Sequence, residues 1–186
     1  MFQIRIHGRG GQGVVTAAEM LSIAAFDEGK HAQAIPSFGS ERMGAPVVAY
    51  VRIDDDPIEL TEPVMRPDLL IIQDPTLFQA IDVFDGLADD GFLLINTARE
   101  LPELHIDEAL ARLHDQHVYT VAATELAVRH LGRATPNTAL LGALTALSEV
   151  LHLDSVITAI NDKFSGDVAE RNVTVARAAH DAAHAT

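Results

Sequence analysis

The chain opens with a strand, a glycine-rich loop and a helix in direct succession. Residues 2–7 alternate apolar and polar side chains, as a half-buried strand does. The loop Gly8, Arg9, Gly10, Gly11, Gln12 and Gly13 follows at once and fits the pattern G-x-G-x-x-G. A helix rich in small apolar residues is expected from there to about Glu28, ended by Gly29. A strand that passes straight into a helix packs that helix on its own sheet, so this unit favours an α/β fold.

Short apolar runs alternate with helical patterns through the middle of the chain. Strands are expected at residues 31–35, 46–53, 69–73, 92–95 and 118–121, with helices at 77–84 and 106–114. A short extended piece at 58–60 is expected to form a hairpin with the strand before it, at an antiparallel edge. This alternation predicts a three-layer, Rossmann-like α/β/α fold with a mostly parallel, mixed sheet.

The last third of the chain is expected to be helical. Helices are predicted at residues 125–130, 136–151, 155–161 and 167–183, and the second should begin with Thr135 as N-cap and Pro136 in its first turn. No linker rich in Pro, Gly or Ser precedes this helical portion, about residues 124–186. Residues 1–186 are therefore expected to form a single domain, with the helical portion packed on the α/β core.

Composition excludes several classes of function. The 186 residues include no cysteine, so this chain offers no thiolate for an iron–sulfur cluster, a disulfide or a cysteine nucleophile. Its net charge of −14 opposes binding to a nucleic-acid backbone. No apolar run approaches the roughly 18 residues that a membrane span requires, and the opening residues do not resemble a signal peptide. A globular protein of the cytoplasm, without nucleic-acid or membrane partners, is expected.

The opening loop is the strongest candidate for a binding site. Its glycines allow positive φ angles and close approach of a ligand, and the amides at the start of a helix attract anions such as a diphosphate. Arg9 adds charge-assisted donors. Two alternatives stay open: glycines that serve only a tight turn, or a site for a nicotinamide dinucleotide. The dinucleotide fits less well, because residues 35–38 end the second strand without the Asp or Glu that normally holds its ribose.

A second loop, residues 37–46, carries two glycines and the adjacent charges Glu41 and Arg42. It is interpreted either as a contact loop for a ligand or partner, which the sheet could bring to face the glycine loop, or as a surface turn with a solvated ion pair. Asp74 or Thr76, after a later strand, is expected to cap a helix rather than to take part in chemistry. No catalytic residue and no metal ligand is predicted.

Four segments, in this order along the chain, resemble the gamma subunit of pyruvate:ferredoxin oxidoreductases. They are HGRGGQG at residues 7–13, SFGSERMGAPV at 37–47, QDPTL at 73–77 and PNTALLGA at 136–143. The matches are spread over most of the chain and are together far more specific than the glycine motif alone. The second segment departs slightly from the family, because Arg42-Met43-Gly44 stands where a pair of arginines often precedes the glycine.

The resemblance implies a function for the whole complex. Enzymes of this family oxidatively decarboxylate a 2-oxoacid on thiamine diphosphate, pass electrons through iron–sulfur clusters to ferredoxin and release acyl-coenzyme A. This chain would then be a non-catalytic subunit that contributes to coenzyme A binding and assembly. Its partners would be the alpha, beta and ferredoxin-like delta subunits, which hold the thiamine diphosphate, magnesium and clusters. Pyruvate is the expected 2-oxoacid, with a branched-chain or other 2-oxoacid as an open alternative.

The same resemblance carries the expected binding residues. The coenzyme A site is expected at Gly8, Arg9, Gly10, Gly11, Gln12 and Gly13, where main-chain amides and Arg9 hold phosphates, and Ser40, Glu41 and Arg42 are expected to line the subunit junction. Two other functions stay open: a free-standing Rossmann-like nucleotide-binding oxidoreductase, and a purely structural assembly subunit whose glycines serve packing alone.

Overall fold

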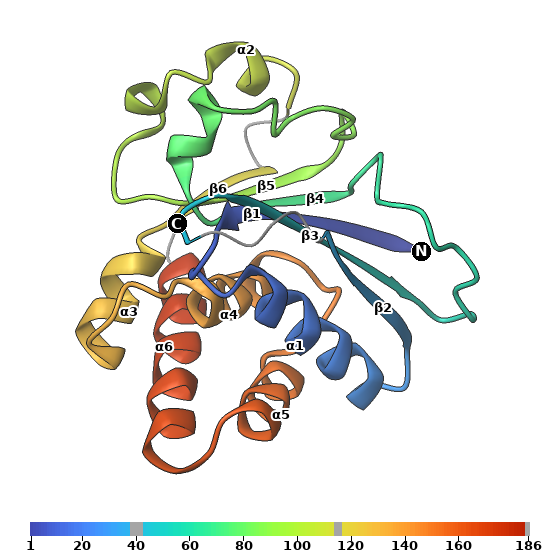
Figure 1. Cartoon of the computed structure of the whole chain (residues 1–186), viewed down its shortest axis with the longest axis vertical. Coiled ribbons are helices and arrows are strands. Elements are labelled where there is room, and N and C mark those ends of the chain that lie inside the picture. The colour runs from blue at the N-terminus through green and yellow to red at the C-terminus, as the bar shows by residue number, and fades with distance from the viewer. Residues whose placement is uncertain (38–42, 114–116, 185–186) are drawn as a thin grey trace.

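The computed structural model of the chain describes residues 1–37, 43–113 and 117–184. Within them, six strands form one sheet in the order β2-β3-β1-β4-β5-β6 (Figure 1). The strands are β1 (Phe2–Arg9), β2 (His31–Pro36), β3 (Pro46–Asp54), β4 (Leu69–Ile72), β5 (Phe92–Asn96) and β6 (Val118–Val121). The strand β3 runs antiparallel to both of its neighbours, and the remaining pairs are parallel. The expected mixed sheet is confirmed.

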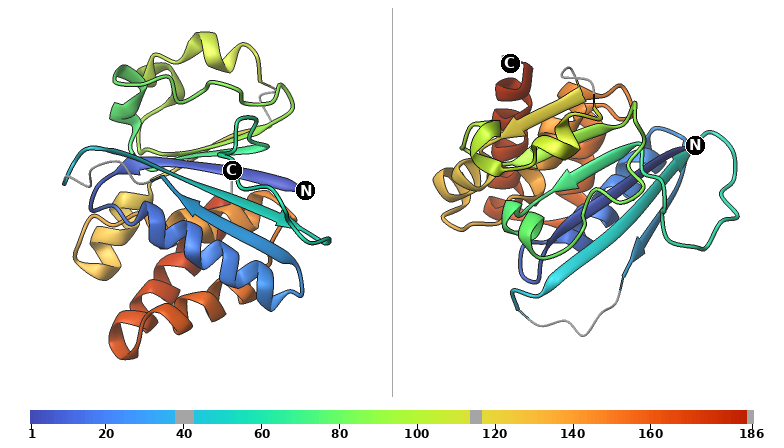
Figure 2. Two further views of the ribbon diagram at one scale, coloured as in Figure 1. Left: turned by 45° about the vertical axis from the view of Figure 1, so that its right-hand side comes forward. Right: turned by 90° about the horizontal axis from the view of Figure 1, so that it is seen from above.

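Helices cover one face of this sheet and shorter elements cover the other (Figures 1 and 2). The first face carries α1 (Val14–Asp27), α3 (Ala123–Leu131), α4 (Asn137–Leu147), α5 (Leu153–Lys163) and α6 (Gly166–His184). The second carries the 3₁₀ helices η1 (Pro75–Gln79) and η2 (Leu101–Leu104) and the single-turn α2 (Asp107–Leu110). The three-layer α/β prediction is confirmed. None of the helices in the described ranges is long and apolar enough to cross a membrane.

The sequence-based predictions fail mainly in the second layer. The helix expected at residues 77–84 is only the 3₁₀ helix η1, and of the one expected at 106–114 only the turn α2 forms among the described residues, with residue 114 outside them. Short helices are marginal without strong packing, and the first contains the turn former Asp82 and is followed directly by Asp85 and Gly86. The extended piece at residues 58–60 is not a strand, and β3 instead forms its antiparallel edge pairing with β2.

Each face of the sheet has its own apolar core. Ile4 and Ile6 of β1 point toward the helical layer, whereas Leu70 and Ile72 of β4 point toward the short helices. The helical portion belongs to the first core, because α4, α5 and α6 contribute buried residues to it alongside α1. Glu28 also accepts a hydrogen bond of 2.7 Å from the amide of His152, at the start of α5. The C-terminal helices therefore pack on the α/β core.

The start of α4 differs by one residue from its prediction. Pro136, not Thr135, takes the N-cap position, and no side chain caps this helix. The first intrahelical bond runs from the amide of Leu140 to the carbonyl of Pro136. The fixed φ of proline suits a helix start, but its neighbour Thr135 lies one residue too early for its hydroxyl to act as the cap.

Candidate functional site

The loop between β1 and α1 depends on glycine at two positions. Gly11 and Gly13 have φ angles of 95° and 73°, in the left-handed region that other residues rarely adopt. A Cβ atom on Gly13 would also lie 2.5 Å from Nδ2 of Asn137, at the start of α4. These two glycines therefore fix the path of the chain from strand to helix, whatever the loop binds.

The loop leaves some of its main-chain amides free and uses others. The amide of Gly10 donates to the carbonyl of Ala45 (2.9 Å), and that of Gln12 donates to the carbonyl of Arg9 (3.1 Å). The first bond of α1 runs from Ala17 to Gly13, and no side chain caps this helix. Among the described residues, the amides of Gly11, Gly13, Val14, Val15 and Thr16 have no acceptor. An anion would therefore meet the first turn of α1 more than the middle of the loop.

A cavity of about 460 Å³ lies over these free amides. Its lining residues come from the loop, from the first turn of α1, and from the start of β3 and the residues just before it. They are Arg9, Gly10, Gly11, Gly13, Val14, Val15, Thr16, Met43 and Val47. Met43 is 87% exposed, and a Cβ atom on Gly11 would lie 2.6 Å from its sulfur. One wall of the cavity thus offers main-chain donors, and the other offers the apolar side chains of Met43 and Val47.

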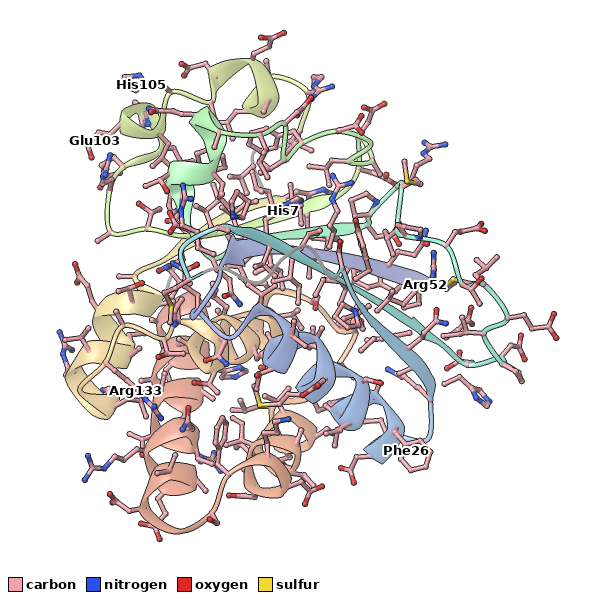
Figure 3. The ribbon with its side chains drawn as sticks, in the orientation of Figure 1. His7, Phe26, Arg52, Glu103, His105 and Arg133 are labelled. Carbon is pink, nitrogen blue, oxygen red and sulfur yellow. The ribbon has the colours of Figure 1, made fainter. Side chains whose placement is uncertain are left out.

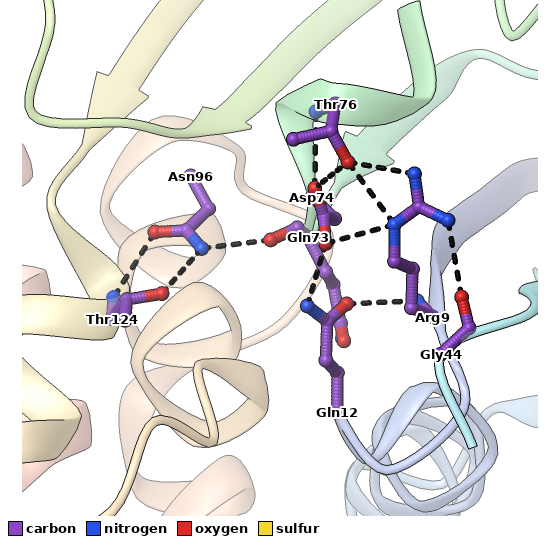
Figure 4. A network of polar contacts seen from close by, with 8 residues as sticks. All are labelled: Arg9, Gln12, Gly44, Gln73, Asp74, Thr76, Asn96 and Thr124. Atoms are coloured by element: carbon purple, nitrogen blue, oxygen red, sulfur yellow. Dashed lines mark hydrogen bonds and ion pairs between the residues drawn. The ribbon is translucent and has the colours of Figure 1, made fainter. Parts of the chain in front are cut away.

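Arg9 takes part in a polar network beside the cavity (Figure 4). Its Nε and Nη2 donate to Oγ1 of Thr76 at 3.0 and 2.7 Å, and its Nη1 donates to the carbonyl of Gly44 at 3.0 Å. Nε also lies 3.2 Å from Oδ2 of Asp74 in an ion pair. The side chain of Gln12 donates to that same Oδ2 (2.9 Å) and accepts from the amide of Arg9 (2.8 Å). Asp74 therefore offsets part of the positive charge of Arg9.

Asp74 caps η1 as the sequence predicted. Its Oδ1 accepts from the amide of Thr76 at 3.0 Å and from the hydroxyl of Thr76 at 2.6 Å. Burial opposes ionisation of this carboxyl, but the hydrogen bonds from Thr76 and Gln12 and the charge of Arg9 outweigh burial and lower the pKa of Asp74. The side chain is therefore ionised at neutral pH.

A second crevice, of about 340 Å³, lies at the carboxyl ends of β4, β5 and β6. Asn96 organises it: Nδ2 donates to the carbonyl of Gln73 and to the hydroxyl of Thr124, each at 2.7 Å, and Oδ1 accepts from the amide of Thr124 at 3.0 Å (Figure 4). Asn96 thus joins three neighbouring segments at this end of the sheet. The side chain of Gln73 is 1% exposed, and its amide atoms have no partner in the part of the chain described.

The residues expected to bind a ligand are only partly brought together. Arg9, Gly10, Gly11 and Gly13 line the first cavity. Gly8 lies within β1, where a Cβ atom would come within 2.6 Å of the side chain of Val14, and Gln12 turns toward Asp74. Ser40, Glu41 and Arg42 lie outside the described residues. The described end of their loop does lie beside the glycine loop, since the amide of Gly44 donates to the carbonyl of Gly10 (3.1 Å).

Comparison with known proteins gives the family. The model of the pyruvate ferredoxin/flavodoxin oxidoreductase family matches residues 3–182. This chain belongs to that family. It is 45% identical over 181 residues to the "Pyruvate/ketoisovalerate oxidoreductases common subunit gamma" of Pyrococcus abyssi, covering 97% of this chain and 96% of the relative. It is therefore a gamma-type subunit of a 2-oxoacid:ferredoxin oxidoreductase complex.

Two solved structures support the same fold. The pyruvate oxidoreductase subunit PORC of Thermotoga maritima has a TM-score of 0.80 at 33% identity, over 97% of this chain and 95% of that one. The 2-oxoglutarate:ferredoxin oxidoreductase of Magnetococcus marinus has a TM-score of 0.76 at 17% identity, over 100% of this chain and 31% of that one. At that identity the second likeness shows the fold alone. The family resemblance read from the four segments is confirmed.

Sequence reasoning missed residues that form the cavity. Val15 and Thr16 line it, as do Met43 and Val47 on the opposite side. The rule that the first four amides of a helix lack intrahelical partners could have pointed to the first turn of α1. Met43 and Val47 lie in the segment 37–47 that the sequence analysis singled out, but they were not named as site residues, because the pairing of β1 with β3 brings them to the loop from more than 30 positions away.

Proposed function

We propose that the first turn of α1, together with partner subunits, binds a phosphate group of coenzyme A in a 2-oxoacid:ferredoxin oxidoreductase complex. The observation that supports this most is the set of amides of Gly11 and of residues 13–16, which have no acceptor in the part of the chain that the structure describes, at a helix start that no side chain caps. Such amides and the helix dipole favour an anion. The cavity of about 460 Å³ above them is of the size that holds a small ligand or part of a larger one.

The residues present suit both chemical parts of coenzyme A. The amides face the space where phosphate oxygens would accept hydrogen bonds, while Val15, Met43 and Val47 offer contact to less polar parts of the molecule. Arg9 stands at the rim with donors beyond those used for Thr76 and Gly44. The Magnetococcus relative was solved with coenzyme A bound, which agrees with this ligand class.

In this proposal the chemistry takes place elsewhere in the complex. The reaction would be oxidative decarboxylation of a 2-oxoacid, expected to be pyruvate, to acyl-coenzyme A, with ferredoxin as electron acceptor, in the cytoplasm. The iron–sulfur clusters would belong to partner subunits, because this chain supplies no cysteine thiolate. The family resemblance implies that thiamine diphosphate and magnesium also belong to partners among the alpha, beta and delta subunits. This chain would orient coenzyme A and contribute to assembly.

A free-standing nicotinamide enzyme is less well supported. In a dinucleotide-binding fold the second strand lies next to the first, and an acidic residue at its end holds the ribose. Here β3 lies between β1 and β2, and β2 ends at Pro36. The end of β2 is thus separated from the glycine loop by a whole strand.

The experiment compares two isosteric changes at Thr16, the third residue of α1. In Thr16→Asp, a carboxylate in the first helical turn favours the helix but competes with a phosphate for its amides. Thr16→Asn has the same shape without the charge. In the assembled complex, Thr16→Asp should raise the KM for coenzyme A about tenfold relative to Thr16→Asn. Coenzyme A-independent reduction of a dye by the 2-oxoacid should be unchanged.

The outcome separates the proposal from a purely structural role. Equal KM values for coenzyme A in the two variants, with both complexes intact by gel filtration, would contradict phosphate binding at α1. Loss of assembly in Thr16→Asp alone would point instead to this helix start as a subunit contact.

A further inference from the structure

The glycine loop lies at a special point of the sheet. After β1 the chain crosses the helical face through α1, whereas after β4 it continues on the opposite face through η1. The two connections diverge at the carboxyl ends of these adjacent strands, and in open α/β sheets ligands bind in the crevice that this creates. Here Arg9, Gln12, Asp74 and Thr76 lie at that point and bond to one another (Figure 4).

Asp74 makes more contacts than capping requires. A cap needs one carboxylate oxygen, and Asp82 shows this simple case, since its Oδ1 accepts only from the amide of Phe84, at 3.1 Å, in the described residues. In Asp74, Oδ1 accepts from Thr76, whereas Oδ2 accepts from Gln12 and pairs with Arg9. The second oxygen therefore joins the end of β4 to the glycine loop.

The bonds made by Oδ2 extend to both walls of the cavity. Gln12, held at 2.9 Å, accepts from the amide of Arg9 and so closes the turn at Gly10 and Gly11. Arg9, held at 3.2 Å, reaches the carbonyl of Gly44, next to Met43 of the opposite wall. Two main-chain bonds between Gly10 and residues 44–45 complete the connection. Moving Asp74 would therefore move the donor wall and the apolar wall together.

We infer that Asp74 is a positioning residue for coenzyme A: it holds the glycine loop and the end of the 37–46 loop in the arrangement that binds the phosphate. This inference rests on the proposed function. Asp74 is absent from the lining of the cavity and acts through Arg9 and Gln12.

The test replaces one oxygen of Asp74. Asp74→Asn keeps an oxygen to cap η1 but puts an NH₂ group where Oδ2 accepts from Gln12 and pairs with Arg9. Asp82→Asn is the matched control, because it alters a carboxylate that caps a turn in the same layer without touching the loop. In the assembled complex, Asp74→Asn should raise the KM for coenzyme A about tenfold, the scale of a lost charge-assisted hydrogen bond. The kcat at saturating coenzyme A should stay within about twofold, and Asp82→Asn should match the wild type.

A double-mutant cycle shows whether Asp74 acts through Arg9. If it does, Asp74→Asn combined with Arg9→Gln should raise KM by less than the product of the two single changes. An unchanged KM for coenzyme A in Asp74→Asn would overturn the inference about Asp74. Independent effects of the two substitutions on this KM would overturn it as well. In either case, a large increase of KM in Thr16→Asp would still support the proposed function. If Thr16→Asp also left KM unchanged, the proposed function would fail and the role of Asp74 would fail with it.

Discussion

At the scale of single residues, His7 shows how burial sets the response to acid. His7 lies on β1 (Figure 3). It is 7% exposed, and both ring nitrogens lack a hydrogen-bond partner among the described residues. Burial, reinforced by the positive charge of Arg5, lowers the pKa of His7 from 6.5 to about 4. The folded state thus resists protonation of a ring that the unfolded chain protonates readily.

The consequence is a loss of stability below neutral pH. The pKa of His7 is lower in the folded state than in the unfolded state. The contribution of the neutral ring to the free energy of unfolding is therefore complete above pH 6.5, and it is lost progressively as the pH falls toward 4. Between pH 7 and pH 5 the wild type should lose about 2 kcal/mol more unfolding free energy in urea than His7→Gln does. His31→Gln, at an exposed site, should follow the wild type. If the unfolding free energies of the wild type and His7→Gln changed with pH in parallel, the lowered pKa of His7 would be refuted.

How far the sequence predicts the site also depends on the residue. The glycine loop, its place between strand and helix and the cap at Asp74 follow from local patterns. The link from Gln12 to Asp74 does not, because it joins residues 62 positions apart. Its geometry depends on the parallel pairing of β1 with β4, which no local pattern encodes.

At the scale of elements, the strands and the helix α1 were predicted well, and the short helices were not. The strands follow from side-chain alternation or from short apolar runs such as LLII in β4, and α1 follows from its apolar residues at helix spacing. The second layer is built from single turns whose positions depend on tertiary contacts, such as the bond from Nη2 of Arg5 to the carbonyl of Val83 (3.0 Å). Such bonds come from a distant strand, so local patterns do not reveal where these turns form.

The packing of α4 on α6 gives a prediction at this scale. A Cβ atom on Gly142 of α4 would lie 2.0 Å from the main-chain oxygen of Ala176 in α6, so the two helices touch at their backbones. Gly142→Ala should lower the unfolding free energy by about 2 kcal/mol, since overpacking outweighs the better helix propensity of alanine. Thr174→Ala, on the exposed side of α6, should change it by less than about 0.5 kcal/mol in the same urea titration. An unchanged unfolding free energy in Gly142→Ala would show that α4 and α6 can move apart at little cost in free energy.

At the scale of the whole molecule, the layers were predictable and the strand order was not. Alternating strands and helices indicated three layers. The position of β3 between β2 and β1, antiparallel to both, cannot be predicted from local sequence patterns. The helical portion shares one core with α1 and the sheet, which supports our proposal that residues 1–186 form a single domain. A single calorimetric transition is expected for it, and two separate transitions would argue for two domains.

The most direct test of coenzyme A binding at α1 is a structure of the assembled complex with coenzyme A bound. Our proposal predicts a phosphate of coenzyme A with its oxygens about 2.7–3.2 Å from main-chain nitrogens among Gly11, Gly13, Val14, Val15 and Thr16. Coenzyme A bound elsewhere, with these amides covered by a partner subunit, would contradict it.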